Sequence, residues 1–94
     1  MPRFKVAHIR EQGQDIIIVP LESSFGYKSD SEQAAIIDEL QSHARGAGLG
    51  GTIVPVWDDG GGRMKFIAPR PWHPFFQGLS LTSVYANLNR ELYW

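Results

Sequence analysis

The chain has 94 residues, and its hydrophobic fraction of 43% and charged fraction of 20% are those of a folded protein and exclude a disordered one. It contains no cysteine, which excludes disulfides, thiolate metal ligands and a cysteine nucleophile. Nine Lys and Arg against ten Asp and Glu give a net charge of −1, without the basic excess typical of nucleic-acid-binding proteins.

These properties lead us to expect a single small domain over residues 1–94. The absence of cysteine fits a cytoplasmic setting. The N-terminal residues are charged and do not form an apolar signal sequence. The apolar stretch from Ile16 to Leu21 is far too short to span a bilayer, so we expect no membrane association.

The first forty residues predict a β-hairpin followed by a helix. Alternation over Arg3–Glu11 predicts a first strand, and Gln12–Asp15 has the composition of a turn. The continuous β-branched run Ile16–Val19 is typical of a central strand covered on both faces. The sequence Ser29–Glu32 fits a capping box, and a helix should follow whose apolar stripe is Ile36, Ile37, Leu40 and Ala44 and which Gly46 and Gly48 end.

A second hairpin is expected after the helix. Thr52–Trp57 reads as a third strand, but Pro55 lacks an amide hydrogen, so we expect this strand at a sheet edge or with a bulge. Asp58–Gly62 is a glycine-rich hairpin turn, and Met64–Ala68 should return as the fourth strand.

The C-terminal third is aromatic. Three prolines within Pro69–Gly78 should exclude a regular helix there. A second helix is expected to begin near a Ser80 N-cap, with Leu79 and Val84 as a hydrophobic staple. Its buried stripe would consist of Leu81, Val84, Tyr85, Leu88 and Leu92.

Together these elements predict an α+β fold of order ββαββα. We expect a two-layer sandwich with a four-stranded, mainly antiparallel sheet of strand order 1-2-4-3 and both helices on one face.

The segment Arg70–Phe76 is the most unusual part of the sequence. Prolines stiffen it, and Arg and Trp are frequent at binding hot spots. We therefore predict a non-catalytic module that binds a protein partner or self-associates through this segment and the C-terminal helix. The proposed contact residues are Arg70, Trp72, His73, Phe75, Phe76 and Trp94. The structural alternative is that these aromatic side chains cover the sheet of a domain with little core.

Two further hypotheses belong to other functional classes. In a nucleic-acid-binding protein, Arg63, Lys65 and Arg70 would contact phosphates while Phe66 or Trp72 stacks on bases. In a small acid–base enzyme, His73 would act with Arg70 and an acid such as Asp58, although about 17 Å of strand separates the ends on which they lie.

No cofactor or metal is expected. The glycines of Gly46–Gly51 follow a helix and precede a strand, the reverse of a phosphate-binding loop. Asp58 and Asp59 lack the spacing of a calcium loop, and a solvated hairpin turn explains them. His8, His43 and His73 show no metal-ligand spacing, and the serines fit caps and turns, so we assign no catalytic residue.

Overall fold

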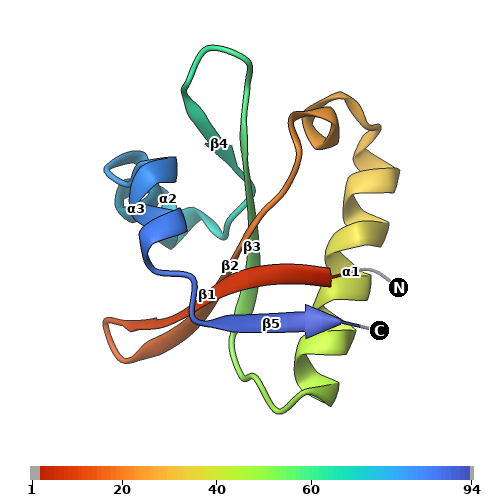
Figure 1. The fold of residues 1–94 in the computed structure, drawn as a ribbon, viewed down its shortest axis with the longest axis vertical. Helices are drawn as coiled ribbons and strands as arrows, with labels where there is room; N and C mark the ends of the chain where they lie inside the picture. The colour runs from red at the N-terminus through yellow and green to blue at the C-terminus, as the bar shows by residue number, and fades with distance from the viewer. Residues whose placement is uncertain (1–2, 94) are drawn as a thin grey trace.

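The computed structural model describes residues 3–93, and Figure 1 shows its arrangement. Its strands are β1 (Arg3–Glu11), β2 (Gln14–Pro20), β3 (Thr52–Asp58), β4 (Met64–Phe66) and β5 (Arg90–Tyr93). Its helices are α1 (Asp30–Gly46), α2 (His73–Gln77) and α3 (Leu81–Ala86), with 3-10 turns η1 (Ser23–Tyr27) and η2 (Arg70–Trp72). Within residues 3–93, every helix falls short of the length and apolarity needed to cross a membrane.

The described residues form an α+β fold around one mixed sheet, as predicted in outline. The sheet has five strands in the order β4-β3-β2-β1-β5, so both the expected four strands and the expected order 1-2-4-3 were wrong. The order differs because α1 connects β2 to β3 as a crossover, which makes these two strands parallel neighbours. The other three pairings are antiparallel.

Helices cover both faces of the sheet, whereas we expected both helices on one face. The α1-face cluster joins Leu40 and Ala44 of α1 to the sheet residues Val6, Ile17, Val19, Ile53 and Leu92. The α2/α3-face cluster joins Trp72, Phe76 and Val84 to Ala7, Ile16, Ile18, Val54 and Val56. Figure 1 shows α1 on one side of the strands and α2 and α3 on the other. Both clusters are needed because β2 and β3 are apolar on both faces.

The two predicted hairpins are confirmed. β1 and β2 pair in register around a two-residue turn in which Gln12 and Gly13 both have positive φ angles, 52° and 76°. This is the type I′ arrangement, whose twist matches that of the flanking strands. β3 and β4 pair antiparallel across the Asp58–Gly62 turn.

Both predicted ends of α1 are also confirmed. Ser29 accepts a hydrogen bond from the Glu32 amide, and the Glu32 carboxylate accepts one from the Ser29 amide. Hydrogen bonds from the Ser29 side chain and backbone hold the pKa of Glu32 below its ordinary value. At the other end, Gly48 has a φ of 80° and the Leu49 amide donates to the Ala44 carbonyl, which completes a Schellman motif.

We expected Pro55 at a sheet edge or at a bulge, and it lies at neither, because β3 is an inner strand whose pairing with β2 is continuous. β3 is flanked by β2 and β4, and Pro55 pairs with Val19 of β2. Its carbonyl oxygen accepts a hydrogen bond from the Ile67 amide at 3.1 Å, so its nitrogen also faces the β4 side. The regular pairing of β4 ends at Phe66, one position short of Pro55. The missing amide hydrogen therefore interrupts no part of that ladder.

The prolines after residue 68 did not exclude helix. Pro71 lies in the first turn of η2, and Pro74 lies in the first turn of α2. Amide hydrogens are not used in a first turn, so proline is tolerated at these positions. Both helical turns are short, and neither proline lies in a helix interior, where it would break the backbone hydrogen bonds.

The predicted C-terminal helix is correct only at its beginning. Ser80 caps α3 as expected, but the helix ends at Ala86 and the chain becomes strand β5. The Asn89 side chain explains the change, because it donates to the His8 carbonyl and accepts from the His8 amide, as a neighbouring strand would. Tyr85 is consequently 57% exposed, and Leu92 is buried as a residue of strand β5 instead of a helix.

We expect Trp72→Ala to destabilise the protein by about 3–5 kcal/mol, because it removes a buried indole from the α2/α3-face cluster. Arg70→Ala, two residues earlier and exposed, should change the free energy of unfolding by less than about 0.5 kcal/mol. Urea denaturation followed by circular dichroism measures both values. Equal stability of the two variants would contradict the placement of Trp72 in the core.

Candidate functional site

The predicted aromatic segment mainly covers the sheet of its own chain. Trp72 is 7% exposed and Phe76 is 1% exposed, while Phe75 is half-buried between them. The Phe75 ring packs edge-on against Trp72 at 5.9 Å and against Phe76 at 5.1 Å. Arg70 remains exposed. Trp94 lies outside the described residues, and partner binding by this segment stays a prediction.

His73 has a structural environment. Its Nε2 atom lies 2.9 Å from the Ala68 carbonyl oxygen, and its ring packs edge-on against Phe66 at 5.4 Å. The proposed acid partner, Asp58, belongs to the β3–β4 turn, where its carboxylate accepts two backbone hydrogen bonds. Both groups have local hydrogen-bond partners, and no hydrogen bond or ion pair among residues 3–93 joins them.

The residues predicted to bind nucleic acid do not share one surface. Lys65 is exposed on β4 between Met64 and Phe66, which face the α2/α3-face cluster, so Lys65 points to the opposite face. Arg70 lies in η2, on the cluster side. The Phe66 ring packs against Phe76 at 5.3 Å and is therefore engaged within the fold. Nucleic-acid binding stays a prediction that this geometry does not favour.

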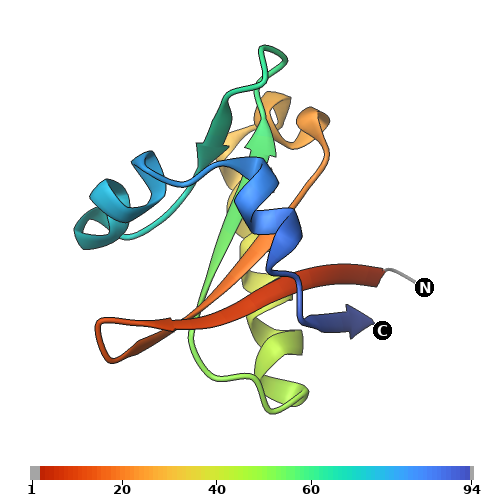
Figure 2. The same cartoon turned by 60° about the vertical axis from the view of Figure 1, so that its left-hand side comes forward.

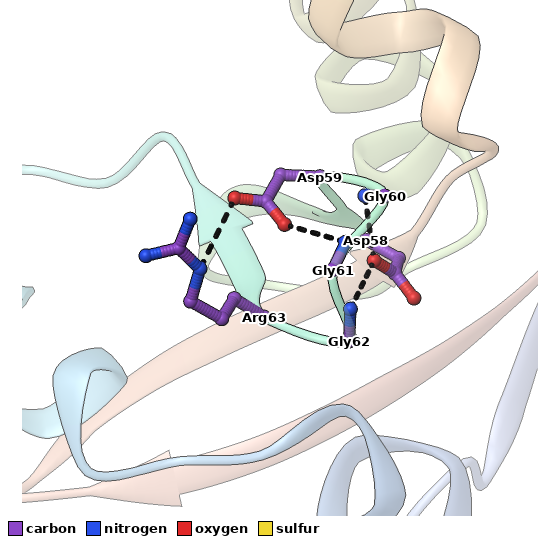
Figure 3. A network of polar contacts seen from close by, with 6 residues as sticks. All are labelled: Asp58, Asp59, Gly60, Gly61, Gly62 and Arg63. Atoms are coloured by element: carbon purple, nitrogen blue, oxygen red, sulfur yellow. Dashed lines mark hydrogen bonds and ion pairs between the residues drawn. The ribbon is translucent and has the colours of Figure 1, made fainter.

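The paired aspartates close their own turn (Figure 3). Asp58 Oδ1 accepts hydrogen bonds from the amides of Gly60 and Gly62, at 2.8 and 3.1 Å. Asp59 Oδ1 accepts from the Gly61 amide, and its other oxygen lies 3.6 Å from Arg63 Nε. The two carboxylates thus accept the hydrogen bonds of turn amides that would otherwise need backbone carbonyls, as expected of Asp in turns. In residues 3–93, no group of three His, Asp or Glu side chains is placed to hold a metal ion.

The strand β5 forms one edge of the sheet. No other strand of residues 3–93 lies beyond it, and a hollow lies on each side. The hollow toward α3 has a volume of about 600 Å³ and includes Tyr85 and Glu91. The hollow toward α1 has a volume of about 610 Å³ and includes Leu92 and Tyr93. Tyr93 is 64% exposed.

A separate pocket of about 490 Å³ lies between α1 and η1 at the carboxyl end of β2. Its apolar walls include Phe4, Leu21, Ile36 and Leu40. Glu22, Ser24 and Lys28 line it from η1 and the residues beside that turn. Sequence reasoning assigned no role to residues 22–28. The signal that could have found this pocket was the position of these residues, directly after the carboxyl end of a parallel strand.

Three contacts hold η1 in place as a wall of this pocket. Phe25 is buried and packs edge-on against Trp57 of β3, with ring centroids 5.0 Å apart. The Gln33 side chain of α1 donates to the Phe25 carbonyl at 2.9 Å. Gly26 lies so close to Trp57 that a Cβ atom there would be 2.5 Å from the indole nitrogen. The wall is therefore anchored to both the sheet and the helix.

Comparison with known proteins adds no relative. No family model matches the chain, and neither a curated protein nor a solved structure matches it significantly.

The anchored wall predicts opposite effects of alanine at two glycines. Gly26→Ala should cost about 1–3 kcal/mol, because its Cβ would overlap the buried Trp57 indole. Gly46→Ala should be stabilising by up to about 1 kcal/mol, because Gly46 is helical and has open space around it. Thermal and urea unfolding by circular dichroism distinguish the two. A neutral Gly26→Ala variant would contradict the close contact with Trp57.

Proposed function

We propose that this chain is a non-catalytic interaction module that self-associates by pairing β5 with β5 of a second copy. The observation that carries the proposal is the edge position of β5 together with the hollows on both its sides. An added strand points its side chains alternately to the two faces of a sheet. Both hollows lie where such side chains would enter. Strand addition of this kind is a common mode of protein recognition.

The backbone of β5 is oriented for pairing. The His8 amide and carbonyl face β5, because both bond to the Asn89 side chain. By strand alternation, the backbone groups of Val6 and Phe4 also face β5, and their register partners Arg90 and Leu92 face back. The amide and carbonyl groups of Glu91 and Tyr93 consequently face outward, where a second strand can bond to them.

Charge and the length of the pairing together favour one register for a two-fold pair. A two-fold axis perpendicular to the sheet preserves the two faces, so only residues of the same face can lie opposite one another. Centring the axis on Arg90 or on Glu91 would oppose two like charges, which is destabilising. Centring it on Leu92 places Glu91 opposite Tyr93 of the partner and avoids both repulsions. Centring it on Tyr93 would also avoid them but would pair fewer residues of β5. We therefore propose this register.

The proposal moves the predicted interface from residues 70–76 toward the end of the chain. Arg70 and the half-buried Phe75 belong to the same C-terminal third, but β5 supplies the hydrogen-bonding edge. Four residues form a short edge, so the interface should be small and the dimer weak. A cytoplasmic setting is part of this proposal.

We expect the wild-type chain to approach twice its 10.5 kDa mass as its concentration rises toward about 1 mM, in the range of a small transient interface. Glu91→Pro should remain monomeric because it removes an outward amide hydrogen. Glu91→Gln keeps that hydrogen and should associate like the wild type. Sedimentation equilibrium measures all three. A wild-type monomer throughout this range would refute the proposal.

The register can be tested by cross-linking, since the chain has no cysteine of its own. A chain carrying both Glu91→Cys and Tyr93→Cys should form disulfide-linked dimers under mild oxidation, because these positions lie opposite one another across the axis. Glu91→Cys alone should cross-link poorly. Efficient cross-linking by the single variant would show that the axis passes Glu91 instead of Leu92.

A further inference from the structure

We propose that the pocket between α1 and η1 binds a free α-amino acid with a large apolar side chain. This site is separate from β5 and does not depend on self-association.

The charges at η1 are of both signs and lack ion-pair partners. Glu22 immediately precedes η1, and Lys28 immediately follows it. Both line the pocket, and neither side chain makes an ion pair with another residue of 3–93. Arg3, at the pocket's other side, instead lies 3.8 Å from Glu91. Glu39 lines the pocket from α1 as a second carboxylate. On the η1 wall itself, Glu22 offers an acceptor for an ammonium group and Lys28 a donor for a carboxylate.

The remaining walls favour an apolar side chain. Leu21 and Ile36 are half-buried, and Leu40 is fully buried beneath them. These side chains come from the end of β2 and the inner face of α1. A volume of about 490 Å³ is within the range of small-ligand pockets. An aromatic or long aliphatic amino acid can lie on this floor while its charged groups remain at η1.

The location is one where α/β sheets bind ligands. β2 and β3 are parallel, and the chain leaves β2 toward η1 and α1 before entering β3. β1 lies on the other side of β2 and runs antiparallel to it. The β1–β2 hairpin lies at the amino end of β2, so the connection to η1 and α1 alone leaves its carboxyl end. In open α/β sheets, ligands bind in the crevice outside the carboxyl ends of the strands.

A zwitterion fits this wall better than an ion of one sign. A ligand with only a carboxylate could use Lys28 but would place no group against Glu22. A ligand with only an amine would leave Lys28 without a partner. An α-amino acid supplies both charges on one carbon, beside the point from which its side chain extends. Both ion pairs would be exposed, so each should change affinity by only about two- to fivefold.

The test is a titration of the ¹⁵N-labelled chain followed by NMR. The ligands are L-phenylalanine, N-acetyl-L-phenylalanine, which lacks the ammonium group, and L-phenylalaninamide, which lacks the carboxylate. We expect L-phenylalanine to bind with a dissociation constant of about 1 mM and to shift the amide signals of Leu21, Phe25 and Ile36. Each blocked analogue should bind about two- to fivefold more weakly.

Two variants assign the charges, and two matched variants control for net charge. The Glu22→Gln chain should bind N-acetyl-L-phenylalanine as tightly as that same variant binds L-phenylalanine. The Lys28→Gln chain should bind L-phenylalaninamide as tightly as that same variant binds L-phenylalanine. Glu11→Gln and Lys65→Gln change the same charges at exposed positions outside the pocket and should preserve the wild-type preferences.

The outcomes separate this inference from self-association. The Tyr93→Pro chain lacks the other outward amide hydrogen of β5 but keeps the Arg3–Glu91 ion pair, and it should bind L-phenylalanine like the wild type because Tyr93 does not line this pocket. Absence of shifts at Leu21, Phe25 and Ile36 well above millimolar ligand would overturn the site. Equal binding of all three ligands to the wild type would overturn the role of Glu22 and Lys28.

Discussion

Burial of the two parallel strands on both faces is the constraint on which this fold depends. Ile16 and Ile18 of β2 face the α2/α3-face cluster, while Ile17 and Val19 face the α1-face cluster. A strand that is apolar on both faces is stable only when both are covered. The crossover helix α1 covers one face and also places β3 beside β2. The chain after β4 must then supply the second cover, and η2, α2 and α3 do so.

The aromatic composition of residues 70–76 follows from this requirement. The helices available on that face are short, with five residues in α2 and six in α3. Large rings bury more area per residue than aliphatic side chains, so a few of them can cover what a longer helix would. Trp72 and Phe76 therefore occupy the interior, although proline, tryptophan and arginine together resemble a binding segment. Composition alone does not distinguish these two uses.

Local patterns predicted local structure well. The capping box at Ser29, the glycine-dependent end of α1 and both hairpin turns depend on residues close in sequence, and all are confirmed. The run Ile16–Val19 also correctly indicated a strand covered on both faces, which already conflicts with helices on a single face. The strand β5 was missed because its pairing depends on a contact between Asn89 and His8, 81 residues apart. The pocket was missed for the same reason, since its walls come from β1, β2, η1 and α1.

The two candidate surfaces lie where this double cover ends. Figure 2 shows the sheet strongly twisted, with β1 and β5 running across the direction of β3. The helices cover the central strands, whereas the outer edge of β5 pairs with no further strand of residues 3–93 and the corner after β2 is left open between α1 and η1. The edge presents a backbone that can pair, and the corner presents Glu22 and Lys28 beside apolar walls. Neither Glu91 nor Tyr93 lines the corner pocket, and neither Glu22 nor Lys28 lines the hollows beside β5. A small sheet that must bury both faces of its centre thus leaves two separate places where recognition can develop without disturbing the core.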